Sequence, residues 1–136
     1  MLGRGHFADP DPDAPQLDLA DTDLRRSYLS RADLRRARLY GADLRRVRFD
    51  DTDLRGATLT RAYLQEAHLP GAKLQDAVLH HADLRDADLT DANLAGADLR
   101  HANLQGAKLD GVDLRGARLD GTDRGALLDG ADLAGR

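Results

Sequence analysis

Apolar residues recur along the chain with a strict period of five. A leucine occupies every fifth position from Leu19 to Leu119, except that Phe49 stands at one of them. A small residue, most often alanine, precedes most of these central positions by two, and the remaining positions of each repeat are mainly polar, charged or glycine. Two residues in every five are therefore candidates for a buried core.

Neither a straight helix nor a straight strand can bury this pattern. At about 100° per residue, five helical residues rotate by about 140°, so successive leucines would spread around the helix. In a straight strand an odd period would send successive leucines to opposite faces. The pattern fits a chain that extends over a few residues and then turns, and glycines two residues after the leucine, such as Gly41 and Gly56, suit such corners.

The tandem motif A-(D/N)-L-x-x, as in ADLRDADLTDANLAGADLRHANLQGAKL over residues 82–109, resembles the pentapeptide-repeat family. The resemblance covers residues 17–122 and implies an all-β fold, a right-handed quadrilateral parallel β-helix (a solenoid) with four repeats per coil. The centres from Leu24 to Leu119 then form about five regular coils, stacked at about 4.8 Å. A partial, irregular C-terminal coil follows.

The repeat pattern divides the chain into three segments. Residues 1–16 form an irregular N-terminal segment that could cap the first coil, and residues 17–122 form the β-helix. In residues 123–136 the register slips by one, because Arg124 stands where a leucine is due. We expect Leu127 to face outward there and either to help cover the terminus or to form a small self-association patch, which would allow a homodimer through one end of the β-helix. The alternative is a tolerated slip in a fraying last turn.

Composition narrows the class of protein. The 136 residues amount to one domain, 32% of them are charged, and cysteine is absent. No run approaches the roughly 18 apolar residues of a membrane span, and the N-terminus lacks the apolar core of a signal peptide. We therefore expect a soluble, cytoplasmic protein that does not bind membranes, and the family resemblance implies a bacterial one.

Charge is distributed unevenly along the chain. Residues 25–61 hold eleven arginines against five aspartates, net +6, whereas residues 1–24 and 62–136 each carry net −5. Stacking every twentieth residue turns the basic segment into a collar around the first coils, and we take part of it as the candidate partner-binding site: Arg25, Arg26, Arg35, Arg36, Arg45, Arg46 and Arg48. Two interpretations stay open, a solvated surface partly neutralised by aspartate and an anion-binding surface.

No catalytic, cofactor-binding or metal-binding residues are assigned. Asp-Leu-Arg triplets begin at Asp23, Asp33, Asp43, Asp53, Asp83 and Asp113. Their carboxylates are expected to stabilise the local turn and to pair weakly with arginine rather than to act as a general acid and base. His80, His81 and His101 should cluster, but imidazoles without a framing carboxylate are more often plain surface than a metal site.

The leading functional hypothesis is a non-enzymatic, rigid scaffold for protein interactions. The resemblance implies an alternative, because members of the family bind type II topoisomerases such as DNA gyrase by imitating duplex DNA and so protect against quinolones. An enzyme or metal-binding protein built on the histidine cluster is a third. We expect an unidentified protein partner and no direct nucleic-acid binding, since only Tyr28, Tyr40 and Tyr63 could stack on bases.

Overall fold

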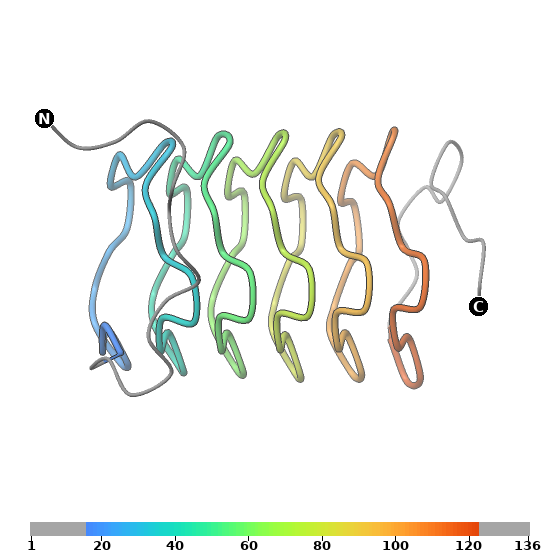
Figure 1. The fold of residues 1–136 in the computed structure, drawn as a ribbon, viewed down its shortest axis with the longest axis horizontal. Helices are drawn as coiled ribbons and strands as arrows, with labels where there is room; N and C mark the ends of the chain where they lie inside the picture. Colours follow the sequence, from blue (N-terminus) through green and yellow to red (C-terminus); the bar gives the residue numbers. More distant parts are fainter. Residues whose placement is uncertain (1–15, 123–136) are drawn as a thin grey trace, which may run out of the picture.

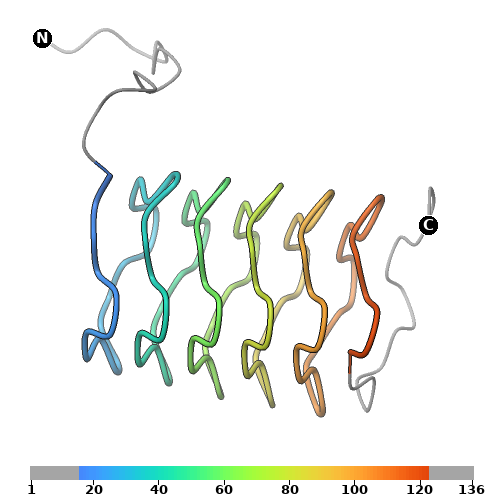
Figure 2. The ribbon, with the colours of Figure 1, turned by 90° about the horizontal axis from the view of Figure 1, so that it is seen from below.

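A computed structural model describes residues 16–122, which wind into a four-sided solenoid whose coils stack along one axis (Figures 1 and 2). Within these residues no helix forms, and each repeat contributes a single-residue parallel β-bridge at the position before its central leucine. Every bridge joins equivalent residues of adjacent coils, from Asp18–Arg38 to Asp98–Arg118. The expected right-handed quadrilateral parallel β-helix is confirmed.

The segment boundaries predicted from the register stay predictions. The predicted N-terminal cap over residues 1–16 lies outside the described residues except for its last residue, and so do the slip at Arg124 and the outward Leu127. In the part of the chain that is described, no helix is long and apolar enough to cross a membrane.

The core is a ladder of leucines with a parallel ladder of small residues beside it. Every central residue from Leu34 to Leu119 is at most 5% exposed, and Phe49 is fully buried at its leucine position. Thr52 is also fully buried, and its hydroxyl donates a hydrogen bond of 2.7 Å to the carbonyl of Leu29 in the coil before. Burial of each leucine contributes roughly 1.5–3 kcal/mol, so the ladder supplies most of the stability of each coil.

Backbone hydrogen bonds join each coil to both neighbours. The amides of Leu44 and Arg46 donate to the carbonyls of Tyr63 and Gln65 at 2.7 and 3.1 Å, and the amide of Asp43 donates back to Thr22 at 2.9 Å. A fourth amide closes the corner within the repeat, as where Val47 donates to Leu44 at 3.1 Å. The fifth amide has no backbone acceptor in this scheme.

That fifth amide explains the aspartate before the leucine. The Arg45 amide donates to Asp43 Oδ1 at 3.3 Å, and the Ala95 amide donates to Asn93 Oδ1 at 3.0 Å. Aspartate and asparagine are the residues that accept such a bond from the backbone two residues on. The expectation that the carboxylate stabilises the local turn is confirmed.

Every corner residue, two positions after the central residue, adopts a left-handed backbone. Its φ angle lies between 54° at Asp51 and 74° at Gly106, whether or not the residue is glycine. With the hydrogen bond across the corner, this conformation is that of a type II turn. Arginine, glutamate and histidine occupy the same conformation as glycine, at a cost of about 1–2 kcal/mol each.

Some corner glycines also make room for the coil before. An aspartate Oδ1 of one coil lies where a Cβ would stand on the glycine below it. This arrangement occurs at Asp21–Gly41, Asp51–Gly71, Asp76–Gly96, Asp86–Gly106 and Asp91–Gly111. Gly116 differs, because the nearest atom to its missing Cβ is the Gly96 backbone nitrogen at 3.9 Å. A substitution of Gly116 therefore measures the cost of a positive φ angle without the added cost of a steric clash.

Leu84→Lys tests the assignment of inward and outward positions. Leu84 is 1% exposed, so we expect the buried ammonium to lower the free energy of unfolding by about 3 kcal/mol or more. Arg85→Ala, one residue later and outward, is expected to lower it by about 0.5 kcal/mol or less. Urea unfolding measures both values, and similar losses would contradict the assignment.

Paired substitutions at corners test the conformational cost. Gly116→Ala is expected to destabilise the fold by about 1 kcal/mol, because alanine must adopt φ > 0 where it has space but no conformational preference. Arg61→Gly is expected to leave stability unchanged or raise it by up to about 1 kcal/mol, since relief of strain exceeds or offsets the entropy of glycine. The melting temperature should fall for Gly116→Ala and should rise or stay unchanged for Arg61→Gly. A lower melting temperature for Arg61→Gly would contradict the conformational cost assigned to arginine at this corner.

Candidate functional site in the arginine-rich N-terminal coils

The outward positions on either side of each leucine bring aspartate and arginine together. Arg25 donates from Nε to Asp23 Oδ1 at 2.9 Å and from Nη2 to Asp23 Oδ2 at 2.7 Å. The same two-point pairing recurs at Asp33–Arg35, Asp43–Arg45, Asp53–Arg55, Asp83–Arg85, Asp98–Arg100 and Asp113–Arg115. Sequence reasoning missed the pair at Asp98, although its triplet is the same.

Two of these pairs lower the pKa of their carboxylates strongly. The pKa of Asp23 falls to about 2, because the Arg25 side chain and backbone amide both donate to it. The pKa of Asp98 also falls to about 2, chiefly through the hydrogen bond from Arg100. An aspartate that stays ionised at neutral pH cannot donate a proton, and exposed pairs of this kind stabilise by about 0–1 kcal/mol.

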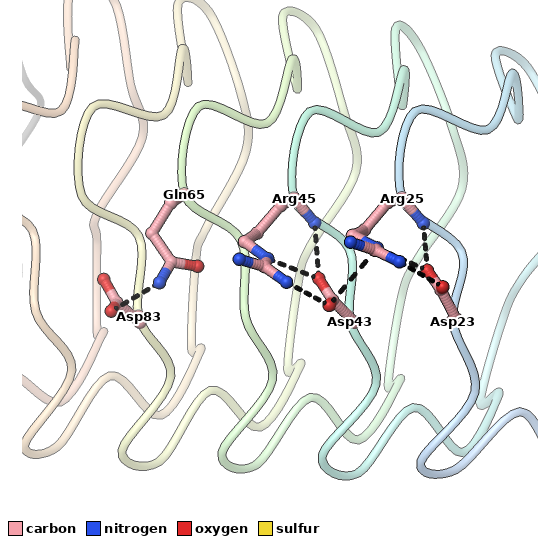
Figure 3. A network of polar contacts seen from close by, with 6 residues as sticks. All are labelled: Asp23, Arg25, Asp43, Arg45, Gln65 and Asp83. Carbon is pink, nitrogen blue, oxygen red and sulfur yellow. Dashed lines mark hydrogen bonds and ion pairs between the residues drawn. The ribbon is translucent and has the colours of Figure 1, made fainter.

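Further contacts link one coil to the next on the side shown in Figure 3. Arg25 Nε lies 3.6 Å from Asp43 Oδ2, so Arg25 contacts carboxylates of two coils. Where Tyr63 replaces the aspartate, Gln65 instead donates to Asp83 in the following coil at 2.9 Å. At the adjoining corner Arg46 pairs with Glu66 at 2.6 Å.

The predicted collar divides into paired and unpaired arginines. Of the eleven arginines in residues 25–61, six form ion pairs, namely Arg25, Arg35, Arg45, Arg46, Arg48 and Arg55. Within residues 16–122, Arg26 and Arg36 have no ion pair or side-chain hydrogen bond, and the same holds for Arg31, Arg38 and Arg61. The available positive charge therefore lies mainly at corners, a distinction that residue type alone does not reveal.

Four collar arginines surround one shallow concavity. It has a volume of about 620 Å³ and is lined by Asp23, Arg25, Arg26, Arg45, Arg46, Gln65 and Glu66. Of its four arginines, Arg26 alone lacks an acidic partner among the described residues. Its guanidinium is the donor group that remains available to an anion there.

The three tyrosines lie on different sides of the solenoid. Tyr28 is 82% exposed, Tyr40 45% and Tyr63 50%. Counting four repeats per coil, each belongs to a different column, because Tyr28 stacks over Arg48, Tyr63 lies between Asp43 and Asp83, and Tyr40 follows the column of Leu39. Successive bases of one nucleic-acid strand could not stack on all three.

The histidines cluster as expected, in a geometry that favours ring packing. His81 and His101 stack face to face with centroids 4.9 Å apart, and His80 meets His81 edge-on at 4.3 Å. Desolvation, together with His80, Arg61 and His101, lowers the pKa of His81. Among residues 16–122 no group of three or more histidine, aspartate or glutamate side chains is placed to hold a metal ion.

Comparisons with solved structures show the same architecture. A pentapeptide-repeat protein, Rfr23 from the cyanobacterium Cyanothece 51142, is 30% identical with a TM-score of 0.76, covering 79% of this chain and 88% of its own. A pentapeptide-repeat protein of the Arabidopsis thaliana thylakoid lumen is 29% identical with a TM-score of 0.57, covering 77% of this chain and 70% of its own. QnrB1, a plasmid-mediated fluoroquinolone resistance protein, is 26% identical with a TM-score of 0.66, and the match covers 86% of this chain and 65% of QnrB1.

Curated protein sequences yield no significant match to the chain. The family of pentapeptide repeats, by contrast, matches with eight copies over residues 17–51, 52–91 and 87–123. These ranges span the described coils, in agreement with the leucine ladder and the parallel bridges. The chain belongs to the pentapeptide-repeat family.

Proposed function

We propose that the protein is a non-enzymatic scaffold that binds a protein partner through its outer surface. The observation that supports this proposal is the difference between the inward and the outward positions of each repeat. Inward positions hold almost nothing but leucine and alanine, whereas outward positions vary from repeat to repeat without disturbing the core. Recognition is therefore encoded on a rigid surface, as in other solenoids.

The basic collar is the part of that surface most suited to an anionic partner. It combines five arginines without acidic partners among residues 16–122 with the concavity lined by Arg25, Arg26, Arg45 and Arg46. Clustered like charges repel one another, and the core does not depend on these arginines. An anionic partner would reduce this repulsion. Complementary charge also raises the rate and the specificity of association.

Binding to a type II topoisomerase such as DNA gyrase is the second candidate. The likeness to QnrB1, at 26% identity and a TM-score of 0.66, favours it, as does the net charge of −5 over residues 62–136. Imitation of duplex DNA requires a continuous acidic face, because the phosphates of DNA are evenly spaced. The net charge of +6 over residues 25–61 interrupts such a face, so the scaffold is the better supported function.

Neutralising the concavity tests the scaffold proposal. The full chain and a variant with Arg25, Arg26, Arg45 and Arg46 all replaced by Gln serve as baits for proteins of the native cell at several salt concentrations. We expect the full chain to retain a partner whose binding weakens as salt rises, and the variant to lose it, because the salt-dependent contacts are removed.

A matched control removes paired arginines outside the collar. Arg85→Gln with Arg115→Gln breaks two Asp–Arg pairs and should leave capture unchanged. Failure of the full chain to retain any protein would contradict the scaffold, and retention by the quadruple variant would exclude the concavity as the binding surface.

DNA supercoiling by purified gyrase separates the two candidates. If the scaffold proposal is correct, an excess of the protein should neither inhibit supercoiling nor restore it in the presence of a fluoroquinolone. QnrB1 serves as the positive control, since it is a fluoroquinolone resistance protein. Protection by this chain at concentrations comparable to those of QnrB1 would establish the topoisomerase function instead.

A further inference from the structure

One side of the first coil combines exposed cations with an exposed aromatic ring. Tyr28 stands in the middle of this side and, at 82%, is the most exposed of the large apolar side chains in residues 16–122. Arg26 and Arg31 occupy the corners at its two ends and are both exposed. Neither has an ion pair among the described residues. We call Arg26, Tyr28 and Arg31 the first-coil patch.

Acidic residues bound the patch but do not neutralise it. Between its two corners the side chains are Ser27, Tyr28, Leu29 and Ser30, none of them acidic. On the sides before and after it, Asp23 and Asp33 are occupied by Arg25 and Arg35. In the next coil Arg48 lies under Tyr28 and pairs with Asp50 at 3.3 Å, and Asp51 forms no ion pair with Arg31 above it. On this side of the described coils, the arginines without ion pairs are thus confined to the first coil.

The backbone at these arginines has the conformation of every described corner. Arg26 and Arg31 have φ angles of 61° and 62°, a conformation that glycine adopts freely and arginine adopts at a cost of about 1–2 kcal/mol. Aspartate at other corners tolerates this conformation better. The neighbouring coils impose this conformation on all thirteen non-glycine corners of residues 16–122, so the φ angle alone does not mark a functional residue. The observation that bears on function is that neither guanidinium group has an ion pair or a side-chain hydrogen bond within these residues.

We infer that the first-coil patch binds an acidic segment of the protein partner, with carboxylates on Arg26 and Arg31 and an apolar group against Tyr28. This inference rests on the scaffold function proposed above. Arginine pairs with carboxylates through two parallel hydrogen bonds, and arginine and tyrosine are the residues that dominate binding energy at protein interfaces. Arg26 also lines the concavity beyond the corner, which extends the surface available to a second carboxylate.

A nucleic acid fits the patch less well than a protein. A strand of bases needs successive aromatic platforms, whereas on this side of the described coils the next outward ring after Tyr28 is His68, two coils away, with Arg48 between them. A short acidic peptide needs one apolar contact and carboxylates at the two corners, and Tyr28, Arg26 and Arg31 can supply these contacts.

Two double variants of the full chain test the inference with the same change in charge. Arg26→Gly with Arg31→Gly removes the patch cations, while Arg36→Gly with Arg61→Gly removes two other unpaired corner arginines on other corners. Glycine suits every one of these corners, so thermal unfolding should show both variants at least as stable as the parent. The probe is a fluorescein-labelled peptide of alternating glutamate and leucine, followed by fluorescence anisotropy.

We expect the parent chain to bind this peptide saturably at low salt, and its glutamine counterpart not to bind. Arg26→Gly with Arg31→Gly should weaken binding about tenfold or more, and Tyr28→Ala several-fold, against about twofold or less for Arg36→Gly with Arg61→Gly. Equal losses in the two double variants, no saturable binding by the parent, or tighter binding of a thymidine oligonucleotide would overturn the inference. If the parent still captures a cellular partner in those cases, the scaffold function stands and only the assigned surface fails.

Discussion

The fold depends on one backbone constraint, a left-handed residue at every fifth position. Every corner residue has a φ angle between 54° and 74°, and this turn lets two side chains of each repeat face inward although the period is odd. A corner of arginine or glutamate costs about 1–2 kcal/mol. Burial of one leucine contributes roughly 1.5–3 kcal/mol, and three hydrogen bonds to neighbouring coils contribute about 0.5–1.5 kcal/mol each, so stacking outweighs the strain.

The same constraint explains which features could be predicted from the sequence. Burial follows from the period alone, so the leucine ladder from Leu34 to Leu119 was predictable, as was the stacking of Arg25 over Arg45. The glycines marked some corners, yet Arg26 and Glu66 adopt the same conformation, because the coils on either side impose it. Ion-pair partners were less predictable. Arg46 reaches Glu66 in the next coil, whereas Arg45 pairs within its own repeat, and residue type does not decide between these two acceptors.

Neutralisation within the repeat changes the meaning of the charge count. An Asp-Leu-Arg triplet carries its own counterion. The net charge of +6 over residues 25–61 therefore does not show which arginines remain available to a partner. Arginines without acidic partners in residues 16–122 lie mainly at the corners. Along one corner column the residues change from Arg26 and Arg46 to Glu66 and Asp86, and Arg46 pairs with Glu66. The solenoid therefore changes sign along its axis, which suits a localised contact better than a uniform face.

Stability does not account for arginine at the first corners. Glycine would adopt the same φ angle without strain, and Gly41 and Gly56 show that glycine is compatible with nearby corners. The first coil is also the coil least able to repay strain, because Leu24 and Leu29 are only partly buried while the leucines of the following coils are fully buried. Three consecutive corners of this coil nevertheless carry Arg26, Arg31 and Arg36. The core does not require these side chains, and the first coil offsets their backbone cost least. The proposed contact with an anionic partner would account for arginines that have no acidic partner in residues 16–122.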